Sequence, residues 1–396
     1  MPPYPLFSYY LYNTTTPVDD NHPVWQQRLP MTRHFTGAKE SSSISHGDYF
    51  LCLRRFLEND GLDIISRALE VRLAKKVKPA NIREIRVCLA KHGEFYHPAR
   101  VEVYSGSQPV GFVLNVALSD SGIRSIHAEY RTLKRLNNEF SRAFIPRVYG
   151  FGEAHTAGGR KIPMFLGDWL DGYHEFHVAD DPAGHGRNIY AWDGDESRSL
   201  FSRDQQAEIY RQAARILTYY YNVESFEQIF GWHHAAGDFI VRAEDGGVDL
   251  KLITVRRYAP HLKMTVDSET GIGPDAETIL QALLLFFLNL SIRMRLDRID
   301  GVGDLVWTDR LAVAATLQGF FEGLTLKEPI SSLPAAIDRC FAYFLSVCTA
   351  EDLGELCQSL AASLDRQAPE TLIVRQNLKE HIASLSRAIE QFLRPS

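Results

Sequence analysis

The spacing of apolar residues changes along the chain and separates segments of different predicted structure. Residues 1–45 mix Pro, Thr, Ser and Asn with scattered aromatics and show no period, which predicts an irregular arm. Beyond it, apolar residues recur at helical spacing over 51–57 and 64–73. Asn59-Asp60-Gly61 separates the two runs, so we expect two amphipathic helices joined at a turn.

From residue 82 the pattern becomes strand-like, with short apolar runs between polar turns. Strands are predicted over 85–89, 99–103, 111–118, 145–152 and 164–172, with one helix, 126–138, after the third strand. We expect Val87, Val101, Val113 and Val116 to share one small antiparallel sheet, against which the helix that carries Glu129 packs.

Residues 180–203 are dense in Gly, Asp, Asn and Arg, which predicts an insertion or a flexible loop. Helical periodicity then dominates, over 205–221, 276–296, 309–324, 334–347, 351–364 and 372–393. The last of these segments has one apolar stripe, from Val374 to Phe392, that is typical of docking on neighbouring helices and less often of dimerisation. No internal repeat is visible.

These segments predict an α+β protein with two lobes and a helical N-terminal extension. We place the irregular arm and helical extension at 1–80 and a small antiparallel-sheet lobe at 81–165. A helix-rich lobe follows over 166–396 and includes a polar hairpin at 231–258. A chain of 396 residues is long enough for several packed units.

Composition excludes some classes of partner. The net charge of −6 offers no basic field for nucleic acid or an anionic membrane. The longest apolar stretch, 279–290, contains Gln281 and Asn289 and is shorter than the ~18 residues expected of a membrane span. Five cysteines without a C-x-x-C pair indicate neither disulfides nor a thiolate zinc site. No signal peptide is recognisable, so we expect a soluble cytoplasmic protein.

The segment 231–241, Gly-Trp-His-His-Ala-Ala-Gly-Asp-Phe-Ile-Val, concentrates the candidate chemistry. It places His233, His234 and Asp238 ahead of two short apolar runs, which is typical of a polar loop mounted on a β-hairpin. Neighbouring histidines on an extended strand point in different directions, so at most one faces a cleft. Either histidine could instead be a loop residue bonded to nearby backbone, and Asp238 could cap the turn after Gly237.

Other histidines offer a weaker metal hypothesis. The candidates are His174 with His177, His92 with His97, and His185. The residues around His174 alternate polar and aromatic side chains as an extended segment does, and third and fourth ligands at family spacing are missing. Zinc is therefore disfavoured. The charged run that includes Arg293, Arg295 and Asp297 is interpreted as a salt-bridge network.

The order of elements and several short motifs resemble the protein-kinase-like superfamily, and within it the aminoglycoside and choline phosphotransferase branch. The resemblance covers roughly 82–258 and a helical tail. Met164 to Gly172 is similar to the hinge strand of that branch, and Glu129 stands where its helix glutamate lies. Gly237 to Val241 matches the end of its catalytic loop, which places Asp238 at the metal-binding asparagine.

The chain also departs from the family pattern at the charged positions. The third strand offers Asn115 or Ser119 in place of the lysine, and His233 falls where the catalytic aspartate belongs. The later metal aspartate falls near Thr254, and the glycine-rich phosphate loop is reduced to Gly93. These departures leave the catalytic motifs degraded.

The resemblance implies ATP and Mg²⁺ as cofactors, with His233 or His234 as a general base and Asp238 as a metal ligand. Lys91 and His92 could close over an anion, or form a solvated hairpin tip. Arg256 and Arg257 could hold phosphate bidentately, or pair with Asp168, Asp171 or Glu129.

Two functions follow from this resemblance. The first is a kinase-like protein with atypical or lost phosphotransferase activity that binds a nucleotide or another anionic ligand in the interlobe cleft, through Lys91, His92, Asp168, Arg256 and Arg257. The second is an inactive pseudokinase that binds or scaffolds a protein partner.

Overall fold

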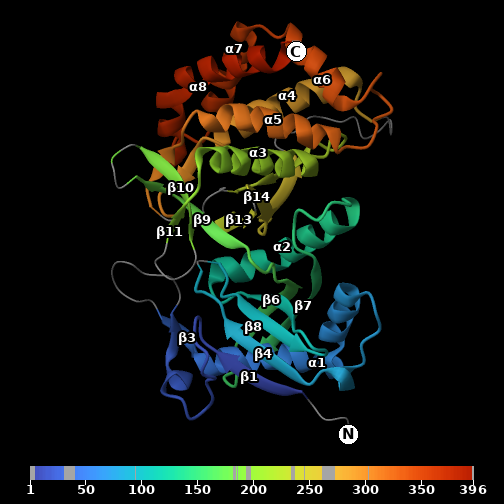
Figure 1. The fold of residues 1–396 in the computed structure, drawn as a ribbon, viewed down its shortest axis with the longest axis vertical. Coiled ribbons are helices and arrows are strands. Elements are labelled where there is room, and N and C mark those ends of the chain that lie inside the picture. Colours follow the sequence, from blue (N-terminus) through green and yellow to red (C-terminus); the bar gives the residue numbers. More distant parts are fainter. Residues whose placement is uncertain are drawn as a thin grey trace. The chain divides into compact units, whose positions relative to one another are not determined.

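The computed structural model describes residues 5–30, 41–93, 95–181, 184, 186–192, 198–232, 237–244, 246–260, 273–301 and 303–394. These residues form two compact units, Met1–Asp171 and Gly172–Ser396, which are described separately below. The chain is an α+β protein, and eight α-helices lie in its described part (Figure 1).

The first unit is built on a six-stranded mixed sheet with the strand order β1-β4-β5-β6-β8-β7. Its strands are β1 (Leu6–Tyr10), β4 (Glu84–Leu89), β5 (Ala99–Tyr104), β6 (Val110–Val116), β7 (Val148–His155) and β8 (Lys161–Asp168). The strands β4, β5, β6, β8 and β7 are antiparallel, as predicted. Along β4 and β5 every second residue is buried, which is why the short apolar alternation revealed these strands.

Residues 6–10 correct the prediction of a wholly irregular arm. They form β1, which pairs in parallel with β4 at the edge of the sheet. The segment shows no alternation of apolar and polar residues, because most of its side chains are partly exposed. Its extended conformation is stabilised by backbone pairing with β4. The remaining short elements before the sheet are a 3₁₀ turn at Pro23–Gln26, β2 (Arg28–Pro30), β3 (Ser41–Ser45) and a 3₁₀ turn at Pro79–Asn81.

Two helices pack on this sheet. Helix α1 (His46–Leu73) begins at a capping box made by Ser45 and Asp48. Its backbone leaves helical geometry at Asn59–Leu62, where the sequence predicted the division into two helices. Gly150 and Gly152 let α1 approach β7, since a Cβ on Gly150 would stand 2.5 Å from Ile64 Cδ1.

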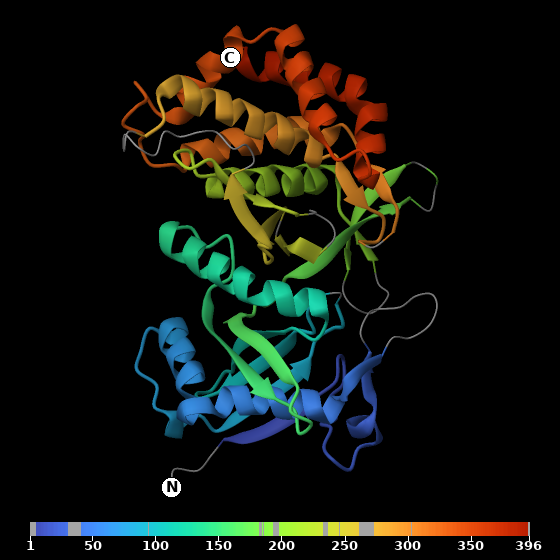
Figure 2. The same ribbon diagram turned by 180° about the vertical axis from the view of Figure 1, so that it is seen from behind.

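Helix α2 (Asp120–Glu139) packs against β7 and β8, as predicted for the helix that carries Glu129. Tyr130 lies 6.0 Å from the ring of Phe165, and His127 stacks on Phe151 at 4.8 Å. Phe165 and its neighbour Leu166 point to opposite faces of β8, and Leu166 belongs to the core shared with α1. The sheet is therefore buried between the two helices (Figure 2).

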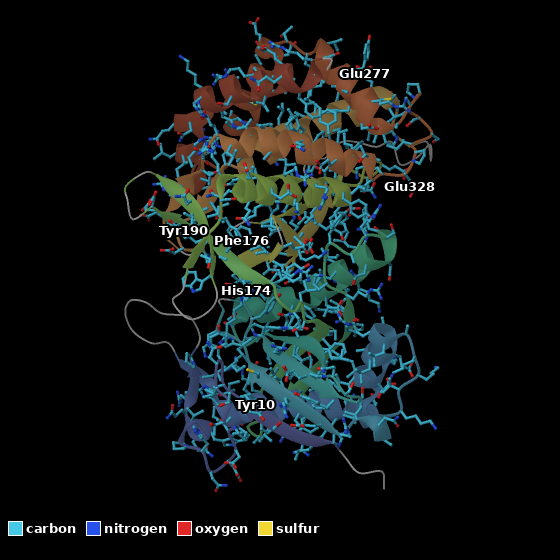
Figure 3. The ribbon with its side chains drawn as sticks, in the orientation of Figure 1. Tyr10, His174, Phe176, Tyr190, Glu277 and Glu328 are labelled. Carbon is cyan, nitrogen blue, oxygen red and sulfur yellow. The ribbon has the colours of Figure 1, made fainter. Side chains whose placement is uncertain are left out.

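The second unit contains a five-stranded sheet with the order β11-β10-β9-β13-β14. Its strands are β9 (His174–Asp180), β10 (Arg187–Trp192), β11 (Arg198–Leu200), β13 (Phe239–Glu244) and β14 (Gly247–Leu252). The β13–β14 hairpin follows the predicted polar loop. Figure 3 labels Phe176 on β9, which is fully buried, and Tyr190 on β10. Two further ribbons are β12 (Glu227–Phe230) with β15 (Arg257–Pro260), and β16 (Leu296–Arg298) with β17 (Leu305–Trp307).

The prediction of an insertion or flexible loop over 180–203 is wrong for the residues described there. Residues 187–192 form β10 and 198–200 form β11, both antiparallel to their neighbours. The Gly-, Asp- and Arg-rich composition masked the strands, because only Ile189 of β10 is fully inside the core.

Six helices complete the second unit: α3 (Arg203–Tyr220), α4 (Ala276–Arg293), α5 (Leu311–Thr325), α6 (Ile337–Val347), α7 (Ala350–Ser363) and α8 (Pro369–Leu393). Each falls where helical periodicity predicted one. Among the described residues, α4 alone is long and apolar enough to cross a membrane, but 56% of it is buried within the protein. We interpret α4 as a core helix.

A close approach between α3 and α5 depends on two glycines one helical turn apart. A Cβ on Gly319 would clash with the backbone oxygen of Arg211, and one on Gly323 would stand 2.6 Å from Thr218 Cβ. Both contacts involve atoms of α3. The two helix backbones therefore meet at a distance that no larger residue allows.

A buried polar group joins α4 to α8. His381 has no exposed surface, and its Nε2 lies 3.1 Å from Ser291 Oγ. Ser291 Oγ donates to the backbone oxygen of Leu288, so His381 Nε2 donates to Ser291. Burial and, to a smaller extent, the Arg295 charge lower the pKa of His381 to about 4, while the Glu380 charge opposes the shift.

We expect Gly319→Ala to lower the free energy of unfolding by about 1–3 kcal/mol, because the added methyl group overpacks the α3–α5 contact. Gly354→Ala is the matched control, since a Cβ at this interior position of α7 meets Ile382 Cγ2 at an ordinary 3.7 Å. That change should be neutral or stabilising by up to about 1 kcal/mol. Urea unfolding of the two variants measures the difference, and equal effects would contradict the close approach.

His381 also predicts a pH dependence. Its pKa in the fold, about 4, lies below its ordinary 6.5, so the unfolded chain binds a proton first as the pH falls. The stabilising effect of neutral His381 is complete above pH 6.5 and is lost towards pH 4, by up to about 3 kcal/mol. Denaturant unfolding at several pH values should show a smaller loss in His381→Gln than in the wild type. Exposed His155→Gln should keep the wild-type loss, and a His381→Gln profile identical to the wild type would refute the assignment.

Candidate functional site

The predicted site residues belong to both units, and two of them cannot be placed. His233 and His234 lie outside the described residues. In the second unit, Asp238, Arg256 and Arg257 are placed next to the β13–β14 hairpin. In the first unit, Lys91 and His92 follow β4, and Asp168 ends β8.

Asp238 is the most buried of these polar residues. Its side chain is 2% exposed, and its two oxygens lie 2.8 and 2.9 Å from Arg256 Nη1. Its backbone oxygen accepts from the N–H of Ile253 at 2.8 Å. The same Arg256 nitrogen donates to the backbone oxygen of Gly231 at 3.0 Å. The pair thus ties together the two chain segments that flank the hairpin.

The Asp238–Arg256 pair bears on the metal prediction for Asp238. Arg256 pairs with Asp238, a partner that the sequence analysis did not consider. A metal ion at Asp238 would have to displace this guanidinium from both carboxylate oxygens. Within the described ranges, no group of three His, Cys, Asp or Glu side chains is arranged to hold a metal.

Arg257 has a different environment from its neighbour. It is exposed at the first position of β15, and its guanidinium lies 5.6 Å from the centre of the Phe230 ring on β12. A cation above an aromatic face gains about 0.5–1 kcal/mol at such exposed sites. Arg257 is therefore accessible to an anion from solvent, while Arg256 is committed to Asp238.

In the first unit, the loop between β4 and β5 folds onto its own sheet and helix. The Gly93 N–H donates to the backbone oxygen of Tyr96 at 3.1 Å, and Ala90 N–H donates to Pro98 at 2.9 Å. Gly122, at the start of α2, has no room for a side chain because the backbone oxygen of Phe95 would clash with it. The loop is held in place at both ends and against α2.

The centre of this loop contacts the residue predicted as the family's helix glutamate. The hydroxyl of Tyr96 donates to Glu129 Oε2 at 2.6 Å, and Glu129 is 2% exposed. The Tyr96 ring also meets the edge of Phe165 at 6.4 Å. On β6, Asn115 lies directly across from Phe165, at the position where the resemblance expects a lysine. A tyrosine hydroxyl thus bonds the glutamate, where the family pairs it with a lysine.

Lys91 and His92 are half-buried in the same loop. The His92 ring lies 5.2 Å from that of His97, which is fully buried and bonds the backbone oxygen of Pro30 at 2.8 Å through Nε2. Burial lowers the pKa of His97, so it is held neutral in the fold. His97 anchors the loop to β2, which contradicts a fully solvated hairpin tip.

Asp168, predicted to bind a cofactor, has three partners within the first unit. It accepts from Arg72 of α1 at 2.8 Å, from the Tyr149 hydroxyl at 2.5 Å, and from the Arg147 N–H at 3.2 Å. Burial and the Asp168 carboxylate both raise the pKa of Tyr149. These bonds join the end of α1 to β7 and β8, which is a structural role. Asp171, the last residue of this unit, pairs with Arg100 at 3.1 Å.

The alternative histidine pair does not form a metal site. His174 and His177 are three residues apart on β9, so their side chains leave opposite faces of the strand. His177 is buried against the ring of Trp192 at 4.6 Å, whereas His174 is exposed. The prediction that this segment is extended is confirmed.

A hollow of about 620 Å³ lies in the first unit between α1 and β7, away from every predicted site residue. It runs along the break in α1, and its charged lining is mixed: Arg55, Asp60, Asp63, Arg67 and Glu153. Its volume falls in the range of small-molecule sites, although its lining is more polar than theirs. No sequence motif pointed to it, since its residues are spread over two distant segments.

Comparison with known proteins adds little to this geometry. No family model and no curated protein matches the chain. Among solved structures, a chain described as WaaP in complex with acyl carrier protein is similar at 11% identity. The match covers 65% of this chain and 85% of that chain, with a TM-score of 0.22. A similarity at this level carries no argument, so the site is interpreted from its own residues.

The neighbouring arginines give a matched test of the second-unit geometry. Arg256→Met should lower the free energy of unfolding by about 3 kcal/mol, because it leaves the buried carboxylate of Asp238 without its cation. Arg257→Met removes an exposed cation above a ring and should cost no more than about 1 kcal/mol. Chemical denaturation measures the free energy of unfolding of both variants. An equal decrease in Arg257→Met and Arg256→Met would show that the Asp238–Arg256 pair does not hold the two segments flanking the hairpin together.

Proposed function

We propose that this chain is a kinase-like protein that has lost phosphotransferase activity and acts by binding. The first unit supports the resemblance, since the antiparallel strands β4, β5 and β6 lead into α2, and β8 and β7 continue the same sheet. In the second unit, Asp238 stands directly before the β13–β14 hairpin, at the end of the loop compared with the family's catalytic loop.

Phosphoryl transfer depends on cations that neutralise the charge of the transferring group. Protein kinases use a lysine on the third strand paired with a helix glutamate, and Mg²⁺ held by an Asp and an Asn. Here the third strand carries Asn115, and Glu129 accepts a hydrogen bond from Tyr96. The Tyr96 hydroxyl is neutral, so its hydrogen bond to this carboxylate supplies no cation to a ligand. This hydrogen bond is the observation that carries the proposal.

The second unit supports the same conclusion through Asp238. Its oxygens are those that a hard cation prefers, yet both lie within 2.9 Å of the Arg256 guanidinium. Removing one group that stabilises developing charge costs about 10²–10³ in rate, and here several are replaced together. Turnover of the ordinary kinase type is therefore not expected.

Binding is compatible with these replacements. In the second unit, Arg257 is an exposed cation, and in the first unit Lys91 and His92 are partly exposed. We propose an anionic small molecule such as a nucleotide as the ligand, held without Mg²⁺, and a protein partner as the alternative. The divergent-enzyme reading, with His233 as a general base, is the competing hypothesis that the following experiment addresses.

The test combines ATP turnover with nucleotide binding on the full chain. We expect no phosphate release from ATP, with or without Mg²⁺. Any rise in the melting temperature with ATP or GTP should be the same with and without Mg²⁺, since the Arg256 guanidinium already pairs with the carboxylate that was compared with the metal ligand. A ligand present at 100 times its dissociation constant stabilises by about 2.7 kcal/mol, which a thermal-shift measurement resolves.

Arg257→Met tests the accessible cation, and should reduce any nucleotide-induced shift without changing the unliganded melting temperature by more than a few degrees. Mg²⁺-dependent ATP turnover that disappears in His233→Ala and in Asp238→Asn would refute the loss of activity. It would instead establish a divergent phosphotransferase with His233 as its base.

A further inference from the structure

The outer edge of β7 borders the hollow of the first unit. β7 is the last strand of the six-stranded sheet, and within the described chain it pairs only with β8. The hollow, of about 620 Å³, is lined by consecutive residues from Gly150 to Ala157. Successive side chains of a strand point to opposite faces of its sheet. A hollow that meets both sets therefore lies along the edge of β7 and not on one face of the sheet.

The register of the sheet shows which backbone groups point to this edge. The backbone oxygen of Pro163 on β8 accepts from the N–H of Ala117 at 3.0 Å, so Pro163 is directed towards the side of β6. Glu153 lies opposite Pro163 in the β7–β8 ladder. In an antiparallel ladder such a pair exchanges no hydrogen bonds, so the N–H and C=O of Glu153 point away from β8. Because the register is regular here, those of Phe151 and His155 point the same way.

A contact from α1 agrees with this direction. The Arg55 guanidinium donates to the backbone oxygen of His155, on the outer side of β7. No backbone hydrogen bond among the described residues satisfies the outward groups of Phe151 and Glu153 or the N–H of His155. A row of unpaired backbone groups at a sheet edge is a template for pairing with another strand.

The opposite wall of the hollow is α1, at its break and just beyond it. Its lining residues there are Asn59, Asp60, Asp63, Ile64 and Arg67. Most charges of the lining are paired within the first unit. Asp63 pairs with Arg67 one helical turn away, and Glu153 pairs with Lys161 at 3.1 Å.

Asp60 differs from these paired groups. It is exposed, accepts from the side-chain amide of Asn59 at 2.9 Å, and forms no ion pair within the described ranges. Arg55, the lining cation outside the pairs, already donates to the His155 oxygen. The wall that faces the edge of β7 thus presents a carboxylate that can accept from a basic side chain.

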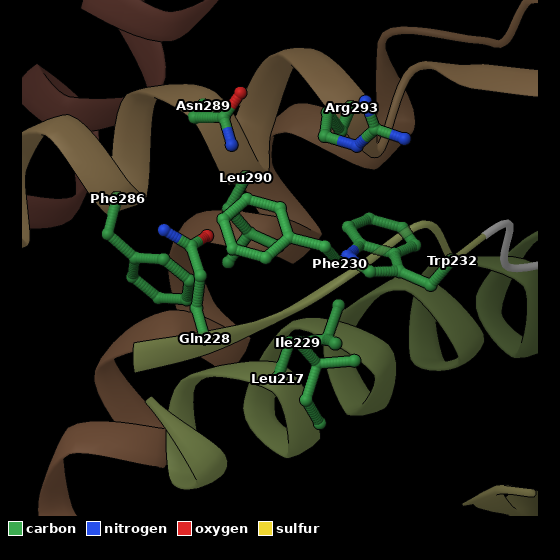
Figure 4. A pocket seen from close by; sticks show the side chains of 9 residues that line it. All are labelled: Leu217, Gln228, Ile229, Phe230, Trp232, Phe286, Asn289, Leu290 and Arg293. Carbon is green, nitrogen blue, oxygen red and sulfur yellow. The ribbon is translucent and has the colours of Figure 1, made fainter. Parts of the chain in front are cut away.

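The pocket between α4 and β12 in the second unit offers no comparable site (Figure 4). Its free volume is about 10 Å³, no more than one water-sized group needs. Arg293 lies there with its guanidinium 5.8 Å from the centre of the Trp232 ring. Its neighbour Arg295 pairs with Glu380 at 3.2 Å, as the salt-bridge interpretation of this run predicted.

We propose that the edge of β7 binds an extended segment of a protein partner, which adds to the sheet as a further strand and places a basic side chain against Asp60. Backbone hydrogen bonds supply most of the affinity in strand addition, and side-chain contacts supply the preference for a sequence. An exposed ion pair with Asp60 contributes little by comparison. The proposal is independent of nucleotide binding, because none of these residues belongs to the site proposed for it.

Hydrogen exchange of the full chain, resolved to single amides, tests whether the edge is free. In the protein alone, the amides of Phe151 and Glu153 should exchange fast, because they point away from β8. Those of Gly152 and Ala154, which point to β8, should be protected. Slow exchange at Phe151 and Glu153 in the protein alone would show that the edge is already covered and would overturn the proposal.

The probe for binding is a short synthetic peptide that alternates Thr and Val around one central Lys, with its affinity measured by fluorescence anisotropy. Binding should be saturable and should slow exchange at Phe151 and Glu153. The same peptide with methylated backbone nitrogens keeps its side chains but cannot donate, so it should bind at least about tenfold more weakly. Equal affinity of the two peptides, or no saturable binding of the first, would refute strand addition.

Glu153→Pro removes the outward N–H and leaves the hydrogen bonds to β8, and proline is tolerated at such positions of edge strands. It should weaken binding of the Lys peptide at least about tenfold. Glu153→Ala is the matched control, since it keeps the N–H, and should bind as the wild type does. Equal binding by both variants would contradict the proposal. If Glu153→Pro melts well below the wild type, the exchange pattern of the wild type with the peptide decides instead.

Asp60→Asn tests the preference for a basic residue, because asparagine also tolerates the left-handed backbone at this position. It should weaken binding of the Lys peptide by up to about fivefold. A peptide with Gln in place of Lys should bind the variant and the wild type equally. A Lys peptide that does not distinguish the two proteins would refute the contact with Asp60.

Discussion

Burying a charge without a partner costs several kcal/mol, and this constraint accounts for most polar contacts at the candidate sites. Asp238 is bonded to Arg256, Asp168 to Arg72, and Glu129 to the hydroxyl of Tyr96. His381 meets the same constraint by staying neutral. Each of these contacts lies within one unit, so the fold itself supplies a partner at each position.

The same constraint limits what the proposed site can do. A carboxylate that accepts from a guanidinium of the same chain gains stability at the expense of metal binding. In a kinase, the helix glutamate orients a lysine towards phosphate oxygens. Here Glu129 instead orients Tyr96, and the loop that carries Tyr96 packs against the start of α2. Under the proposed function, structural contacts stand at both positions where a kinase has catalytic groups, which is why binding rather than turnover is proposed.

Local patterning was sufficient for most elements. The strands β4, β5 and β6 alternate buried and partly buried residues, and the long helices of the second unit have clear periodicity. The break in α1 was visible as Asn59-Asp60-Gly61. The failures were β1, β10 and β11, whose residues carry little apolar alternation and depend on the backbone of a neighbouring strand. A strand that depends on backbone pairing with its neighbour produces no alternation of apolar residues in the sequence.

For a related reason, the sequence indicated residues of the candidate site but not the contacts between them. The type of a residue indicates which interactions its side chain can form, but not which residue it contacts in the fold. Asp238 and Arg256 were both recognised, yet their pairing was not, because they are joined only when β13 and β14 fold back on each other. Asp168 was placed near a ligand on the strength of a family pattern, and it has partners in the fold.

The sequence by itself determined the α+β class, the order of the helices and of strands β4 to β8, and the absence of a third-strand lysine, since these depend on spacing and residue identity alone. Only the tertiary structure decided which charges are neutralised, because pairing joins residues that are distant along the chain. Tyr96 with Glu129 and Arg72 with Asp168 are such pairs. It also left Arg293 beside Trp232 without an ion pair among the described residues, a result of how α4 packs on β12 that no local pattern records.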